Sequence, residues 1–208
     1  MTRRPITLLA AALVSTAALS AGAAFADSDP QEIALFQNAA HDIRAAIATA
    51  EDATGGKAVE AEFDEDDGTG MWEVETVAGT RRAEVQIDAT TGAVVKTKDK
   101  GDIADKDQPV TPDMLGAPLA DLVTKAEAAS GGKVMSIDYE HGKLAGIEVE
   151  MVKPDGSLQE FIMDPADGTL TPLTAGQDQD EAGEAAAEGA NMGQTAPAGG
   201  AGPTGSGG

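Results

Sequence analysis

The chain has 208 residues, no cysteine, 36 acidic and 14 basic side chains, and a formal net charge of −22. The absence of cysteine excludes disulfides, thiolate metal sites, a thiol nucleophile and the lipid-modified N-terminus of a bacterial lipoprotein. The negative charge repels nucleic acid and anionic lipid, and it is suited to basic partners, to divalent cations or simply to solubility.

The first 26 residues indicate an export signal. Arg3 and Arg4 precede an apolar run over residues 6–19, and Ala24-Phe25-Ala26 has small residues at both key positions of a cleavage site. We predict cleavage after Ala26 and a periplasmic or secreted protein. The alternative is an uncleaved membrane anchor, because residues 6–25 are almost wholly apolar.

The first element predicted after the signal is a helix. Apolar residues recur at helical spacing and form one stripe: Phe36, Ala40, Ile43, Ile47 and Ala50. Gly55–Gly56 should end the helix, because a left-handed C-cap residue costs least as glycine. His41 falls on the opposite face, so we expect its side chain to be exposed to solvent.

Three strands and a short fourth strand should follow. In the first two, apolar residues alternate with glutamates, which is typical of half-buried strands: Val59, Ala61 and Phe63, then Trp72, Val74 and Thr76. The third should bury Val85 and Ile87. A D-x-x-x-G hairpin turn at residues 88–92 then leads to a short strand around Val94–Val95. Trp72, the single tryptophan, is expected in the core.

The same order of landmarks appears twice, 76 residues apart. Residues 50–57 (AEDATGGK) fall on residues 126–133 (AEAASGGK), and the turn at 88–92 falls on the one at 164–168. Repetition at a fixed spacing indicates an internal duplication. We therefore predict an α+β fold of two small tandem domains, each with one helix packed on an antiparallel sheet of three to four strands.

The predicted boundaries are a signal at 1–26, a first domain at 27–98, a linker at 99–112, a second domain at 113–173 and a tail at 174–208. The tail is rich in Gly, Ala, Gln and acidic residues and should be disordered, because it cannot bury enough apolar surface to offset the entropy of ordering. Domains this small gain little from a core of their own. We expect the two to form one cooperative body with a pseudo-twofold relation.

The first repeat resembles a PepSY domain. The resemblance rests on a helix ending in A-x-x-x-x-G-G-K, on the strand W-E-V-E-T-V at 72–77, and on A-E-V-Q-I-D-A-T-T-G-A-V-V at 83–95. The second repeat resembles a more diverged copy, with Asp167 in place of Thr91. The resemblance implies an envelope protein or propeptide module that inhibits or regulates a peptidase. It brings no catalytic residues, because the matching positions are turn and core residues.

An acidic segment between the first two predicted strands is the sharpest local feature. Asp64, Glu65, Asp66 and Asp67 precede Gly68 as in a calcium loop. The register fails, because Gly68 at the sixth loop position would make Phe63 the first ligand and Val74 the last. We interpret the segment as an acidic solvated loop whose four acids are candidates for weak cation binding.

No catalytic or cofactor motif stands out. The chain has no G-x-S-x-G, P-loop or G-x-G-x-x-G, and its two histidines, His41 and His141, lack the spacing of a zinc site. We expect a protein that is not an enzyme and that carries no cofactor. The outward glutamates of the second strand in each repeat are either ordinary solvent-face residues or an acidic surface for a basic partner: Glu73, Glu75, Glu148 and Glu150.

These observations predict an exported, non-enzymatic interaction module that inhibits or regulates a peptidase in the cell envelope. Its partner is an unidentified protein; no nucleic acid and no membrane span of the mature chain are expected. The alternative that the sequence leaves open is an envelope protein that senses or binds a ligand or a cation and has no peptidase target.

Overall fold

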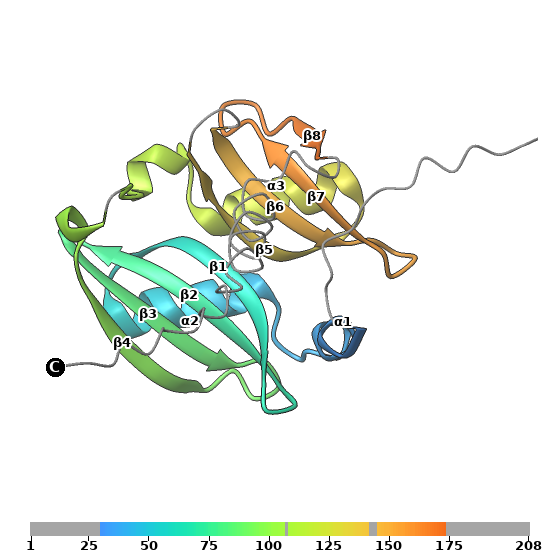
Figure 1. The fold of residues 1–208 in the computed structure, drawn as a ribbon, viewed down its shortest axis with the longest axis horizontal. Coiled ribbons are helices and arrows are strands. Elements are labelled where there is room, and N and C mark those ends of the chain that lie inside the picture. The colour runs from blue at the N-terminus through green and yellow to red at the C-terminus, as the bar shows by residue number, and fades with distance from the viewer. Residues whose placement is uncertain (1–29, 107, 142–144, 174–208) are drawn as a thin grey trace, which may run out of the picture.

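The computed structural model describes residues 30–106, 108–141 and 145–173, which form an antiparallel eight-stranded sheet covered by helices (Figure 1). The helices are α1 (Pro30–Gln37), α2 (Ile43–Thr54) and α3 (Leu119–Ser130), with 3-10 turns η1 (Ile103–Asp105) and η2 (Pro112–Leu115). The strands are β1 (Lys57–Asp66), β2 (Thr69–Ala78), β3 (Arg81–Asp88), β4 (Val94–Asp102), β5 (Lys133–Glu140), β6 (Gly146–Val152), β7 (Leu158–Met163) and β8 (Leu170–Pro172). The α+β class is confirmed. The predicted signal and tail lie outside the described residues.

The sheet is one continuous layer in the order β4-β3-β2-β1-β5-β6-β7-β8. Its two halves meet where β1 pairs with β5, with Ala61 opposite Ile137 and Glu62 opposite Ser136. Ala61 and Ile137 are 76 residues apart, so each is the other's counterpart in the sequence repeat. A residue that pairs with its own counterpart lies on the axis of an isologous contact. The register is therefore the one that a twofold relation between the halves requires.

The prediction of one continuous helix from Phe36 to Ala50 is wrong, because the chain forms two helices there, α1 and α2. The amide groups of Ala40 and His41 donate to the carbonyl of Ala89, at 3.1 and 3.0 Å, instead of to carbonyls of a preceding turn. Asp42 then caps α2, since its carboxylate accepts from the amide of Ala45 at 3.0 Å. The turn after β3 therefore breaks the helix by offering it a competing acceptor.

The predicted turns are confirmed where glycine is needed. Gly55 and Gly131 end α2 and α3 in the left-handed conformation, at φ 68° and 73°. The D-x-x-x-G turns end on Gly92 and Gly168, at φ 69° and 77°. A side chain at these positions would be strained, because L-residues rarely adopt positive φ.

One hydrophobic core runs under both halves. It includes the predicted inward residues Phe63, Trp72 and Val74, together with Ile137 and Val149 from the strands of the second repeat, each no more than 1 % exposed. Trp72 lies in the core as predicted: its ring meets Phe63 edge to face at 5.1 Å, and its Nε1 donates to the His41 carbonyl at 2.8 Å.

The fourth strand is longer than the short strand predicted around Val94–Val95. β4 continues to Asp102, because lysines at alternate positions let an edge strand remain paired on one side and solvated on the other. It thus runs past the predicted boundary at residue 98. None of the described helices is long and apolar enough to cross a membrane.

Candidate interaction surface

The predicted glutamates lie on the open face of the sheet. Glu73 and Glu75 on β2, and Glu148 and Glu150 on β6, alternate with buried residues that face the helices. They therefore point away from the helical layer, and all four are half-buried among their neighbours. Because β1 and β5 join the halves edge to edge, the two predicted pairs belong to one surface.

The structure adds acidic residues that the sequence analysis did not single out. Five pairs of carboxylates stand directly opposite one another on adjacent strands: Glu60–Glu75, Glu62–Glu73, Glu75–Glu84, Asp138–Glu148 and Glu150–Glu160. We call the residues of these pairs the acidic face. Directly opposed like charges destabilise a sheet. Period-two alternation showed which residues point outward, but only the register shows which of them face one another.

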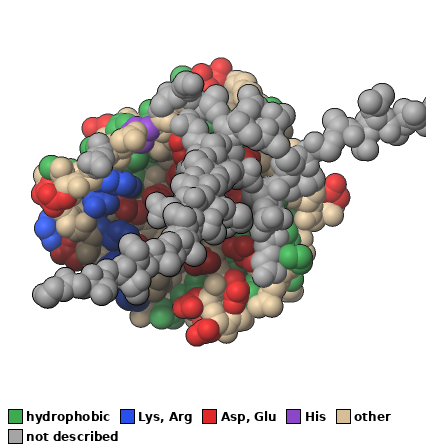
Figure 2. All heavy atoms as spheres, viewed as in Figure 1, with side chains coloured by type: hydrophobic (Ala, Val, Ile, Leu, Met, Phe, Trp, Pro, Cys, Tyr) green, Lys and Arg blue, Asp and Glu red, His purple; other side chains and the backbone are tan. Residues whose placement is uncertain are grey.

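Basic side chains balance one side of this face. Arg82 lies 3.4 Å from the Glu75 carboxylate, and Lys100 donates to Glu84 at 2.5 Å. The hydrogen bond from Lys100, together with the nearby lysines, holds the pKa of Glu84 below its usual value. Figure 2 shows Lys and Arg side chains gathered towards β3 and β4, so positive charge is concentrated along one edge of the sheet.

Glu62 occupies the middle of the acidic face, on the strand that joins the halves. The pKa of Glu62 is raised to about 7. The largest cause is desolvation of its carboxyl group, and repulsion from four nearby carboxylates adds to it: Glu60, Asp64, Glu73 and Glu150. The side chain nevertheless remains exposed, so solvent screens part of this repulsion. Burial and Glu75 also raise the pKa of Glu60. Glu60 and Glu62 therefore take up protons more readily than isolated glutamates do.

This crowding predicts a pH dependence of stability opposite to that of a salt-bridged acid. Because the pKa of Glu62 is raised by folding, the native state binds its proton first, and stability should increase as the pH falls from about 7 towards about 4.5. Glu62→Gln should raise the melting temperature at about pH 8. The gain in free energy of unfolding should be less than about 1 kcal/mol, because the site is exposed to solvent. Thermal melts from about pH 5 to about pH 8 measure both effects.

The matched control is Asp52→Asn, which removes an exposed charge from α2 in the helical layer. It should leave the pH profile unchanged. A Glu62→Gln profile that coincides with that of the parent protein would show that the carboxylates do not interact.

The acidic segment at residues 64–68 is the tip of the β1–β2 hairpin. Asp67 and Gly68 form a two-residue turn, both at positive φ (49° and 80°), as type I′ hairpins require. Glu65 accepts a hydrogen bond from the amide of Gly68. Across the described residues, no three acidic or histidine side chains converge as a metal site would need. Weak cation binding by Asp64, Glu65, Asp66 and Asp67 stays a prediction.

The predicted exposure of His41 is wrong. The segment containing His41 lies between α1 and α2, and the imidazole packs so closely on Gly92 that a Cβ there would come within 2.7 Å of its Cε1. Its half-burial follows from the break in the helix described above. His141 follows β5 and meets the Tyr139 ring edge to face at 5.0 Å.

Comparison with known proteins finds a family match in the first half of the chain. Residues 45–98 match the PepSY family model, described as "Peptidase propeptide and YPEB domain". Among solved structures, a candidate lipoprotein from Clostridium difficile 630 is similar, with 17% identity over 67% of this chain and 96% of that chain and a TM-score of 0.42. No curated protein matches the chain at a significant level. The matched residues include most of α2, the strands β1, β2 and β3 and the turn ending at Gly92, so the resemblance of the first repeat to a PepSY domain is confirmed for residues 45–98.

Proposed function

We propose that this protein is an exported, non-enzymatic module that uses its acidic face to bind a basic segment of a peptidase in the cell envelope, and so inhibits or regulates that peptidase. The family description connects PepSY domains with peptidase propeptides, which favours a peptidase over other partners. Export rests on the predicted signal at 1–26.

The observation that carries the proposal is the set of five directly opposed carboxylate pairs on one sheet face. Such pairs cost stability, which a sheet can avoid by placing a lysine or a threonine opposite a glutamate. Arg82 and Lys100 already offset the charges of Glu75 and Glu84, and a basic partner would reduce the repulsion across the rest of the face, so the arrangement that weakens the free protein would strengthen the complex.

The proposal includes the tandem arrangement predicted from the repeat. Residues 113–173 follow the same order as the PepSY domain, with α3 in the place of α2 and β5–β8 in the places of β1–β4. We take them as a second, diverged PepSY-like domain. Two domains joined edge to edge offer an acidic surface about twice as wide as one, and a lone domain should bind more weakly.

The test begins by isolating the partner with the mature protein from the cell envelope, and then measures affinity and peptidase activity with the purified pair. The double variant Glu73→Gln/Glu148→Gln removes one charge from each half of the acidic face. It should weaken binding about a hundredfold or more and reduce inhibition in parallel, because two charge-assisted contacts are removed and each contributes about 1.5–3 kcal/mol. Binding of the parent protein should also weaken as ionic strength rises.

The matched control is Asp52→Asn/Asp121→Asn, which removes two exposed charges from α2 and α3 in the opposite layer. It should bind like the parent. Equal losses in both double variants would mean that net charge, not this face, attracts the partner. A partner without peptidase activity would favour the alternative of an envelope ligand- or cation-binding protein.

A further inference from the structure

Two clefts occupy corresponding positions where the halves of the chain meet. The first cleft, about 430 Å³, lies between Glu127, Lys133 and Val134 of one half and Ala39, Asp42 and Ile43 of the other. The second cleft, about 290 Å³, lies between Glu51, Lys57 and Ala58 and, from the other half, Leu115, Pro118 and Leu119. Each residue of the second set is 76 positions from its counterpart in the first. The clefts are thus two versions of one site, created by the twofold arrangement.

The two clefts differ in how they are filled. Leu115 is only 1 % exposed and occupies the second cleft, whereas its counterpart in the first is Ala39, which lacks the three additional carbon atoms of leucine. The first cleft also extends over an apolar floor formed by Phe36, Trp72 and Val152. It is therefore the larger cavity, and its volume lies in the range of small-molecule sites.

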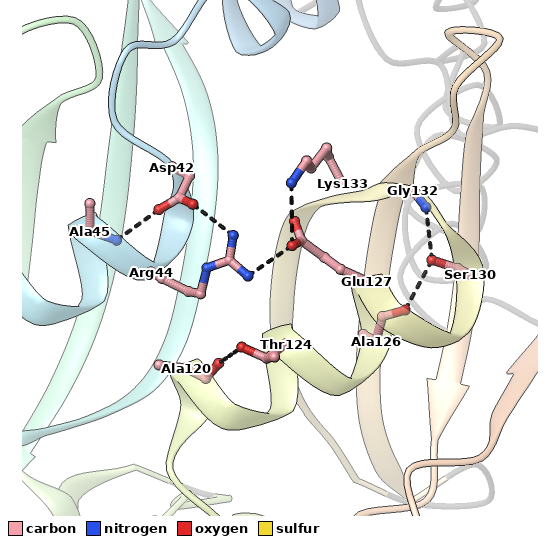
Figure 3. Close-up of polar contacts among 10 residues, drawn as sticks. All are labelled: Asp42, Arg44, Ala45, Ala120, Thr124, Ala126, Glu127, Ser130, Gly132 and Lys133. Carbon is pink, nitrogen blue, oxygen red and sulfur yellow. Dashed lines mark hydrogen bonds and ion pairs between the residues drawn. The ribbon is translucent and has the colours of Figure 1, made fainter.

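The rim of the first cleft carries a network of charges between α2 and α3 (Figure 3). Arg44 donates to Asp42 at 2.7 Å and to Glu127 at 2.9 Å, and Lys133 lies 3.4 Å from the same Glu127 oxygen. The second cleft has the counterpart of the Lys133–Glu127 pair, Lys57 with Glu51 at 3.0 Å, but Ala120 stands there in place of Arg44. Both acids of the rim are thus already neutralised by cations.

A further cation completes the rim. Lys153 lines the cleft and is half-buried, and within the described ranges it makes no ion pair; its Nζ lies 3.5 Å from the amide oxygen of Gln159. The charged residues that line the cleft are Asp42, Glu127, Lys133 and Lys153, and Asp155 interacts electrostatically with Lys153. In a chain of net charge −22, a rim on which lysines match the acids above an apolar cavity differs from the general surface.

We propose that the first cleft binds a small carboxylate with an apolar body, held by Lys133 and Lys153 at the rim and by the floor around Trp72. Lys153 is half-buried, whereas the Lys133 side chain is 65 % exposed. Each ammonium group can donate a charge-assisted hydrogen bond to a carboxylate, and the gain is larger at Lys153 because water reaches that group less. A free C-terminus following an apolar residue of a peptide and a free apolar acid share this chemistry.

Trp72 makes the cleft observable, because it is the only tryptophan of the chain and lies, fully buried, directly beneath the floor. The purified full chain is titrated with N-acetyl-leucyl-phenylalanine, with the C-terminal amide of the same peptide, and with decanoate, by fluorescence and by calorimetry. The peptide acid should change the tryptophan emission saturably, and its amide should bind about tenfold more weakly. Tighter binding of decanoate than of the peptide acid would identify a free apolar acid as the source of the ligand, and the reverse order a peptide C-terminus.

Variants separate the cleft from the rest of the surface. Lys133→Gln and Lys153→Gln should each weaken the acid about tenfold and leave the amide unchanged, and Ala39→Leu should abolish binding by filling the cavity as Leu115 fills its counterpart. Lys57→Gln, at the position equivalent to Lys133, is the matched control and should have no effect. Equal affinity for acid and amide, an equal loss in Lys57→Gln, or no saturable signal at millimolar concentration of any probe would overturn the proposal.

Discussion

The separated halves of the chain, residues 27–98 and 113–173, are expected to be unfolded at temperatures at which the intact protein is folded. Cutting them apart removes the pairing between β1 and β5 and turns two central strands into edges. It also divides a core whose buried residues form one cluster across both halves. Units of this size gain only a few kcal/mol from their own cores, and neither has a disulfide to compensate.

Thermal melts of each half beside the intact protein measure this effect. The control is a protease site inserted between Lys106 and Pro112, which cuts the connection but leaves both halves present. The nicked protein should stay associated and melt in one transition close to that of the intact chain. If each separated half melts at the temperature of the whole, the halves are independent domains and the proposed wide acidic surface loses its basis.

Trp72→Ala is expected to lower the free energy of unfolding by about 3–5 kcal/mol, the usual range for deleting a fully buried aromatic side chain. The indole is 0 % exposed and packs edge to face against Phe36 and Phe63, at centroid distances of 6.0 and 5.1 Å. Its Nε1 also holds the carbonyl of His41, in the segment that breaks the helix. The loss should therefore extend to the docking of α1.

Urea unfolding measures the change in free energy of unfolding. One further variant isolates the contribution of the hydrogen bond, and a surface variant serves as the control. Trp72→Phe keeps much of the ring packing but leaves the His41 carbonyl without its donor, so it should cost about 1–3 kcal/mol. Val95→Ala, at a position 61 % exposed on the edge strand, should stay within about 0.5 kcal/mol of the parent. A Trp72→Ala loss no larger than that of Val95→Ala would mean that the core tolerates the cavity.

The local structure of this protein is determined by its sequence. Gly55 and Gly131, which have positive φ, placed the ends of α2 and α3, and the alternation around Val59–Phe63 and its counterparts placed the inward faces of the strands. These features depend on neighbours within a few residues, so a periodic pattern is enough to predict them. The outward direction of Glu73, Glu75, Glu148 and Glu150 follows from the same alternation.

The tertiary structure determines the features that depend on contacts between residues far apart in the chain. The carbonyl of Ala89 broke the predicted helix before α2, and no local pattern contains that acceptor. The pairing of Ala61 with Ile137 made one sheet of two repeats, and strand register set carboxylate against carboxylate across it. The difference between Ala39 and Leu115 is visible in the sequence, but it becomes a difference between two cavities only because β1 pairs with β5 and brings the two halves of the chain together. Register and docking are set by contacts between residues far apart in the chain, and a single sequence does not encode these in any periodic signal.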